Sequence, residues 1–188
     1  MTQWFESIDT NRDGLLDAKE LQKALAMGNM KVMERTKLRP RWEVGGGLTI
    51  KPIQFSLATV AQMMRIHDSS RNNAGTITFA DFTSLHMLLK SFSETFHRHD
   101  VNKAGRLNLQ QVQQAVQAVG HTLDEAAFLA VSRSFDPNHT HDMGLPEFVA
   151  LCSFLESARA TFVAYDPQRT GIISLNYSQF CYCAAQTR

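Results

Sequence analysis

The sequence has no excess of charge of either sign and no long apolar run. Its 19 Lys and Arg residues nearly balance its 18 Asp and Glu residues, which leaves a formal net charge of +1 at pH 7. Such a balance gives no global field that would attract nucleic acid, so nucleic-acid binding is not expected and any ion site must come from a local arrangement of ligands. No uninterrupted apolar segment approaches the ~18 residues that span a bilayer, so we expect no transmembrane helix.

Cysteine is scarce. Cys152, Cys181 and Cys183 are odd in number and lie in apolar stretches, which is typical of free thiols in a reducing compartment. The amino-terminal segment MTQWFESIDT has no basic stretch followed by an apolar one, so we expect no secretory signal and a cytoplasmic location. The sequence also lacks a phosphate-binding glycine loop and a recognisable pairing of a nucleophile with a base, so we expect no enzymatic activity.

What the sequence does contain is a repeated segment of about twelve residues. It begins with Asp, continues with polar residues, has Gly at the sixth position and an aliphatic residue two positions later. Four copies have this Gly: DTNRDGLLDAKE (9–20), DVNKAGRLNLQQ (100–111), DPQRTGIISLNY (166–177) and, two residues longer, DSSRNNAGTITFAD (68–81). A fifth copy, DPNHTHDMGLPE (136–147), has His141 in place of the glycine. The pattern is that of EF-hand loops, each flanked by two helices.

The spacing of the loops predicts how the intervening helices are shared. Gly75 and Gly105 are as far apart as His141 and Gly171, so each interval holds one helix that serves two loops. The interval from Gly105 to His141 holds two helices and a turn, and a capping box that begins at Thr122 starts the second of them. The predicted boundaries are about 1–28 for the first hand, 56–90 for the second, 91–119 for the third, 122–156 for the fourth and 157–188 for the fifth.

A basic, glycine-rich insertion lies at about 29–55. It is either a docking surface for anionic lipid or an acidic partner, or a solvated loop. Several methionines either line an adaptable peptide groove or fill the core: Met27, Met30, Met33, Met63 and Met64.

The first loop carries every ligand that calcium requires. Calcium takes six to eight oxygens, which an EF-hand loop supplies from positions 1, 3, 5, 7, 9 and 12. These positions hold Asp9, Asn11, Asp13, the main-chain oxygen of Leu15, Asp17 and Glu20. Gly14 makes the sharp turn at the sixth position, and Glu20 supplies the bidentate carboxylate. The sequence therefore predicts a Ca²⁺ site here, with Mg²⁺ as a competitor for the same oxygens.

The other loops have lost ligands. The fourth loop keeps Asp136, Asn138, Thr140, Asp142 and Glu147 and is a candidate for a second, weaker site, with His141 forced into left-handed backbone. The third loop keeps only Asp100, Asn102 and the main-chain oxygen of Arg106, because Ala104 has no side-chain oxygen and Gln111 is a neutral amide; the pattern argues against a site. The second loop ends in the short Asp81 and the fifth in Tyr177, so neither is expected to bind calcium.

EF-hand loops pair through a short antiparallel contact at their eighth positions. This rule predicts that Leu16 pairs with Ile77 and that Leu107 pairs with Met143. Ile173 of the fifth loop then has no partner in its own chain, and an apolar sheet edge of this kind is commonly covered by a second molecule. We therefore expect a dimer interface that contains Ile172, Ile173, Phe180 and Tyr182.

Five such loops, with helices shared between the second and third and between the fourth and fifth, resemble the penta-EF-hand family, the group of sorcin, grancalcin and the calpain small subunit. The stretches ITFADF and FVAYDPQRTG are similar to its programmed-cell-death-6-like subgroup. The resemblance covers the chain apart from the insertion and implies an all-α fold of about eight helices, with five helix-loop-helix units and short loop–loop β contacts. It also implies a homodimer or heterodimer through the fifth hand, and calcium-dependent binding of partner peptides, some of them proline-rich, or peripheral contact with membranes.

Two functional hypotheses remain open at this point. The first is a calcium sensor and adaptor, which exposes apolar surface when the ion binds and then recruits partner proteins. The alternative is a constitutive dimeric scaffold, or the regulatory subunit of a calpain-like cysteine protease, in which calcium is largely structural.

Overall fold

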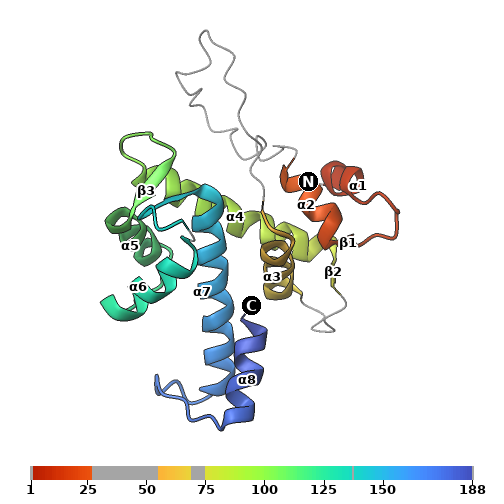
Figure 1. The fold of residues 1–188 in the computed structure, drawn as a ribbon. Helices are drawn as coiled ribbons and strands as arrows, with labels where there is room; N and C mark the ends of the chain where they lie inside the picture. The colour runs from red at the N-terminus through yellow and green to blue at the C-terminus, as the bar shows by residue number, and fades with distance from the viewer. Residues whose placement is uncertain (1, 27–54, 69–74, 137, 188) are drawn as a thin grey trace.

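The computed structural model describes residues 2–26, 55–68, 75–136 and 138–187 (Figure 1). The described residues form eight helices: α1 (Thr2–Ile8), α2 (Ala18–Ala26), α3 (Leu57–His67), α4 (Phe79–His99), α5 (Leu109–Ala118), α6 (Glu125–Ser134), α7 (Leu145–Tyr165) and α8 (Tyr177–Gln186). Four short strands alternate with them: β1 (Leu16–Asp17), β2 (Thr76–Ile77), β3 (Arg106–Asn108) and β4 (Asp142–Gly144). The fold is the expected all-α penta-EF-hand arrangement. All but one residue of the predicted insertion, and residues 69–74 of the second loop, lie outside the described residues.

Two helices of 21 residues each connect neighbouring loops. Helix α4 runs from the second loop to the third, and α7 runs from the fourth loop to the fifth (Figure 1). Helix α4 begins with a capping box, in which the Thr78 side chain accepts from the backbone N–H of Asp81 while the Asp81 carboxylate accepts from the backbone N–H of Thr78. The shared helices inferred from the glycine spacing are confirmed.

The loops pair as the eighth-position rule predicts. Strands β1 and β2 are antiparallel with Leu16 opposite Ile77, and β3 and β4 are antiparallel with Leu107 opposite Met143. All four of these side chains are at most 2% exposed, so each ladder contributes an apolar pair to the core.

Aromatic side chains of the two long helices form the centre of the core. Phe96 of α4 and Phe148 of α7 are buried, with ring centroids 5.7 Å apart. Phe5 of α1 and Phe82 of α4 make a similar contact at 5.6 Å. The core also contains Met63 and Met64 of α3, so these two methionines fill the interior and do not line an exposed groove. Met27, Met30 and Met33 lie outside the described residues.

Helix α7 is, among the described residues, the one helix long and apolar enough by composition to cross a membrane. No such helix was expected, because Glu147, Glu156 and Arg159 interrupt its apolar sequence. Its buried residues include Leu151 and Cys152, and it packs against α3 and α4, as the core helix of a globular domain does.

Helix α6 begins later than the sequence indicated. The expected cap at Thr122 is wrong: Asp124 is the N-cap, and its carboxylate accepts from the backbone N–H of Ala127 at 2.7 Å. Leu123 packs against the core, which places the next residue, Asp124, at the helix entrance.

The carboxyl-terminal helix is tied to the rest of the molecule by main-chain acceptors near its end. The Gln62 side chain of α3 donates to the carbonyl oxygen of Thr187 at 2.5 Å, and the Ser157 hydroxyl of α7 donates to that of Gln186 at 3.1 Å. Figure 1 shows α8 lying alongside α7, with the end of the chain close to α3. The fifth hand therefore has a fixed place beside the other four.

Candidate metal centre

The loops share a backbone conformation that the sequence pattern only partly revealed. The sixth position is left-handed in every repeat, with φ of 78° at Gly14, 72° at Gly75, 72° at Gly105, 59° at His141 and 76° at Gly171. The strained turn expected at His141 is therefore confirmed. The fourth position is also left-handed in four loops, although its residues are not glycines: Arg12, Lys103, His139 and Arg169. The loop shape is thus conserved in the backbone even where the ligands have been lost.

The first residue of each described loop holds this shape through its own carboxylate. The backbone N–H of the sixth residue donates to the first-position Asp in four loops: Gly14 to Asp9 at 2.9 Å, Gly105 to Asp100 at 2.8 Å, His141 to Asp136 at 2.8 Å and Gly171 to Asp166 at 2.7 Å. Because these bonds lie within the protein, the loops are closed without help from an ion. A first-position Asp is therefore not evidence of calcium binding by itself.

In the first loop, the Glu20 carboxylate accepts hydrogen bonds from other residues of the same loop. The hydroxyl and the backbone N–H of Thr10 donate to its Oε1, and the backbone N–H of Asp17 donates to its Oε2. Burial disfavours the charge of Glu20, which is 6% exposed, but these hydrogen bonds outweigh that effect and lower the pKa of the carboxyl group. A nearly buried carboxylate is thus kept ionised at the twelfth position, as a calcium ligand requires.

The remaining ligand positions of the first loop are close to the surface. The Asn11 amide and the Asp13 carboxylate are hydrogen-bonded to each other at 2.9 Å, and the Asp17 carboxylate caps α2 by accepting from the backbone N–H groups of Lys19 and Glu20. In the part of the chain that the structure describes, no three carboxylate, imidazole or thiolate groups already converge on one point. The donor set of this loop nevertheless fits calcium, since all its members are oxygens and four are carboxylates.

The third loop is closed by an amide. Gln111 at the twelfth position accepts from the backbone N–H of Asn108 and donates from its Nε2 to the carbonyl oxygen of His99, both at 2.9 Å. The donated bond shows that the side chain presents an N–H where an EF-hand needs a second carboxylate oxygen. The geometry supports the expectation that this loop does not bind calcium.

In the fourth loop, a guanidinium group from the third loop lies beside the expected ligands. Arg106 was expected to contribute only a main-chain oxygen to the third loop, but its side chain crosses to the fourth loop and forms a 2.6 Å ion pair with Asp142. Sequence reasoning missed this contact. The signal was the ladder register: with Leu107 opposite Met143, Arg106 stands opposite Gly144 and Asp142 opposite Asn108, so residues 106 and 142 are diagonal neighbours across the two strands.

The second and fifth loops lack a usable twelfth ligand. Asp81 is buried and is engaged in the capping box of α4. Tyr177, at the twelfth position of the fifth loop, is 82% exposed, and its side chain has no carboxylate.

The fifth hand carries the largest exposed apolar side chains near the carboxyl terminus. We call Ile172, Tyr177, Phe180 and Tyr182 the fifth-hand surface, and they are 79%, 82%, 61% and 59% exposed. Ile173 is half-buried. The described residues of the fifth loop form no strand pairing, whereas the ladders of the other four loops are complete.

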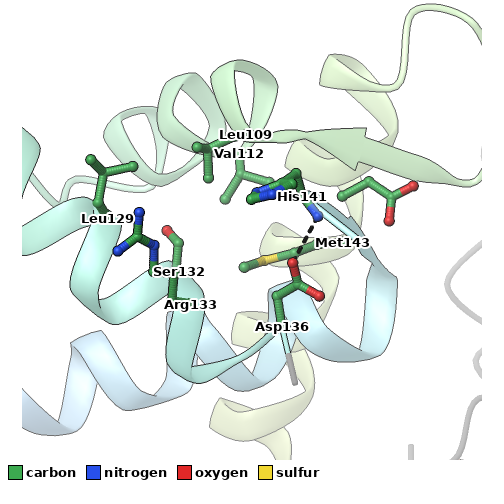
Figure 2. Close-up of a pocket in the computed structure, with 9 residues that line it drawn as sticks. Leu109, Val112, Leu129, Ser132, Arg133, Asp136, His141 and Met143 are labelled. Carbon is green, nitrogen blue, oxygen red and sulfur yellow. Dashed lines mark hydrogen bonds between the residues drawn. The ribbon is translucent and has the colours of Figure 1, made fainter. Parts of the chain in front are cut away.

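A small pocket of about 90 Å³ lies between α5 and α6, beside the fourth loop (Figure 2). Its walls are mainly apolar, and it is lined by Leu109, Val112, Leu129, Ser132, Arg133, Asp136, His141, Asp142 and Met143. The Ser132 hydroxyl is buried and has no hydrogen-bond partner. The pocket is large enough for one small apolar side chain.

Comparison with known proteins agrees with this architecture. Residues 89–153 match the model of an EF-hand domain pair, and residues 1–26 match that of a single EF hand. Peflin of Xenopus laevis is 25% identical over 178 residues, which cover 94% of this chain and 54% of peflin. Penta-EF hand domain-containing protein 2 of Dictyostelium discoideum is 25% identical over 181 residues, which cover 95% of this chain and 74% of that protein.

Among solved structures, a homolog of programmed cell death 6 protein from Leishmania major Friedlin matches with a TM-score of 0.62 and 27% identity. The match covers 100% of this chain and 93% of the other. The likeness therefore extends across all five hands. The chain spans only about half the length of the peflin that it matches.

Proposed function

The chain belongs to the penta-EF-hand family of calcium-binding proteins, and on this premise we propose that it is a calcium-responsive adaptor whose principal ion site is the first loop. The observation that carries the proposal is the state of Glu20. It is nearly buried, it is kept ionised by three hydrogen-bond donors, and it occupies the twelfth position of a loop with all six ligand positions filled by oxygen donors.

The ligands of this site would be Asp9, Asn11, Asp13, the main-chain oxygen of Leu15, Asp17 and Glu20. When bound, calcium would neutralise the carboxylates of these residues. The backbone N–H groups of Gly14 and Asp17 donate to Asp9 and Glu20 and would hold these two carboxylates in place for the ion.

Two surfaces support a role in binding partners. The pocket between α5 and α6 offers space for an apolar side chain of a partner peptide, including the ring of a proline (Figure 2). The fifth-hand surface offers a second apolar area at the other end of α7. An adaptor needs at least one surface that it can present to a second protein.

Calcium titration by calorimetry, with and without Glu20→Gln, tests the proposal. The wild type should bind in the ~10⁻⁷–10⁻⁵ M range of sensor loops, and an apolar dye should bind better with calcium than with chelator. If the wild type does not bind calcium, or if Glu20→Gln leaves its binding unchanged, the assignment of the ion site is wrong.

The fifth-hand surface also favours a second candidate function, a constitutive dimeric scaffold or the regulatory subunit of a cysteine protease of the calpain type. In this alternative, calcium in the first loop is structural and does not gate partner binding. Equal dye binding with calcium and with chelator, in a protein that still binds the ion, would favour the scaffold.

A further inference from the structure

The inference concerns Arg106, which reaches from the third loop onto the fourth. Its Nη2 donates to Oδ1 of Asp142 at 2.6 Å and to the main-chain oxygen of Asp142 at 3.2 Å. Asp142 stands at the seventh position of the fourth loop, where an EF-hand offers its main-chain oxygen to the ion. The guanidinium is therefore bonded to a calcium-ligand atom of the neighbouring loop.

The other ligand positions of the fourth loop are also in use. The Thr140 hydroxyl lies 3.2 Å from both the Asp136 carboxylate and the same main-chain oxygen of Asp142, and its single proton can be donated to either of them. Oε2 of Glu147 lies against the main chain of Gly144, only 2.8 Å from where a β-carbon would stand. The Asp136 and Asp142 carboxylates of this loop are thus hydrogen-bonded within the protein, and the charge of Glu147 acts on the Arg106 cation.

The directions of the pKa shifts of Arg106 and Asp142 agree with this hydrogen bonding. The hydrogen bond to Asp142, together with the charges of Asp142, Glu147 and Asp136, raises the pKa of Arg106, and the bond from Arg106 lowers the pKa of Asp142. Asp142 is therefore the carboxylate that the guanidinium binds directly, while Glu147 and Asp136 act on Arg106 only through their charges.

We propose that Arg106 is a tethered cation that takes over the charge-neutralising role of a divalent ion in the fourth loop, and that it thereby makes the pair of third and fourth hands insensitive to calcium. A divalent ion entering this loop would have to break two hydrogen bonds and approach a fixed positive charge. The guanidinium is always present, because it belongs to the same chain.

This proposal differs from the expectation that the fourth loop is a second, weaker calcium site. The donor set of Asp136, Asn138, Thr140, Asp142 and Glu147 does not fit the ion while the guanidinium is bonded to Asp142. It deepens the proposed function, because calcium would then act only through the first and second hands. It does not depend on that function, since it concerns a different loop.

An ordinary surface ion pair is the alternative. The Arg106 and Asp142 side chains are 47% and 38% exposed, and pairs of that kind contribute little to stability. The two readings differ in calcium binding and not in stability, so the test must measure the ion.

The experiment uses the full chain with Glu20→Gln, which silences the first loop. In this background, Arg106→Gln should restore binding of one calcium ion per chain, with a dissociation constant in the ~10⁻⁴–10⁻³ M range of weak EF-hands. This affinity should be at least tenfold higher than that of the Glu20→Gln protein alone. Adding Glu147→Gln should abolish the gain, which places it in the fourth loop. Arg106→Lys should stay silent, since it keeps the charge.

Lys90→Gln is the matched control, because Lys90 pairs with Glu94 on α4 at similar exposure and its loss should restore nothing. Arg106→Met is a second variant in case the amide supports a new contact. An Arg106→Gln and an Arg106→Met protein that both fold and both remain silent would overturn the proposal. Calcium binding at the fourth loop in Glu20→Gln alone would do the same. If the first loop of the wild type did not bind calcium, the proposed function would fail, but the comparison between the Arg106 variants would remain valid.

Discussion

Thr10 and Glu20, at the second and twelfth positions of the first loop, are joined by two hydrogen bonds to one carboxylate oxygen. The hydroxyl of Thr10 donates to Oε1 of Glu20 at 2.7 Å, and its backbone N–H donates to the same oxygen at 2.9 Å. The third loop has Val101 at the position of Thr10 and Gln111 at the position of Glu20, and it still forms its capping box. A carboxylate at the twelfth position is therefore not needed for the loop to fold.

The first prediction follows from this comparison. Glu20→Gln should leave the fold intact and weaken calcium binding by well over tenfold, because the amide has only one oxygen to offer and no charge. Calorimetry is the measurement, and circular dichroism checks the fold. Glu147→Gln in the fourth loop is the matched control and should leave the titration unchanged. A Glu20→Gln protein with wild-type affinity would rule out the first loop as the principal site.

The second prediction concerns assembly through the fifth hand. Burying the fifth-hand surface between two copies removes large apolar side chains from water, at roughly 1.5–3 kcal/mol for each one fully covered. Wild type should therefore be dimeric at micromolar concentration, and Ile173→Asp should make it monomeric by placing a charge at the unpaired edge. Light scattering measures the mass.

Met87→Asp is the control for this variant, because Met87 is 66% exposed on α4 and lies outside the fifth hand. It should leave the mass unchanged. A monomeric wild type, or an Ile173→Asp protein that remains dimeric, would contradict the interface.

The third prediction concerns backbone strain at His141, whose φ is 59°. Left-handed backbone costs a residue with a side chain about 1–2 kcal/mol. A glycine removes this cost, but its greater conformational entropy in the unfolded chain offsets about half of the stabilisation. His141→Gly should therefore stabilise the protein by about 0.5–1 kcal/mol, or raise its melting temperature by about 1–4 °C. Gly105→Ala, at the same position of the third loop, should lower the melting temperature. Unchanged or lower stability in His141→Gly would show that the side chain makes a compensating contact.

The fourth prediction concerns pH. His121 is buried, with Nε2 3.3 Å from Glu156, but the contact lacks hydrogen-bond geometry. Burial lowers the pKa of His121, Glu156 acts in the opposite direction, and Arg159 reinforces the lowering. Because the folded pKa is below the unfolded value of about 6.5, this histidine's contribution is fully present above pH 6.5 and is lost as pH falls toward the folded pKa.

The free energy of unfolding should accordingly fall between pH 7.5 and pH 5.5, with His121 contributing to the fall. Urea unfolding at the two pH values measures the difference, and His121→Gln should reduce it. The exposed His97→Gln should not. If His121→Gln and wild type lose the same free energy of unfolding between the two pH values, His121 does not cause the pH dependence. His67 and His86, whose pKa values burial also lowers, would then carry it.

Much of the fold could be read from the sequence because an EF-hand is a local device. The sixth-position turn, the capped helix entrances and the pairing of Leu16 with Ile77 all depend on residues within one loop or on a fixed loop position. The glycine spacing then set which helices are shared. The helix cap at Asp124 was missed because the sequence offers two local candidates for the N-cap, Thr122 and Asp124, and the local pattern alone does not choose between them.

The ligand pattern of the first loop was likewise a property of the sequence by itself, since twelve consecutive residues contain the whole donor set. Only the tertiary structure revealed the side chain that the fourth loop receives from another loop. Arg106 reaches Asp142 diagonally across the β3–β4 ladder, in which Arg106 stands opposite Gly144 and Asp142 opposite Asn108. The anchoring of Thr187 by Gln62 is of the same kind, across 125 residues of sequence. Contacts of this sort depend on where helices pack, and local residue patterns do not carry that information.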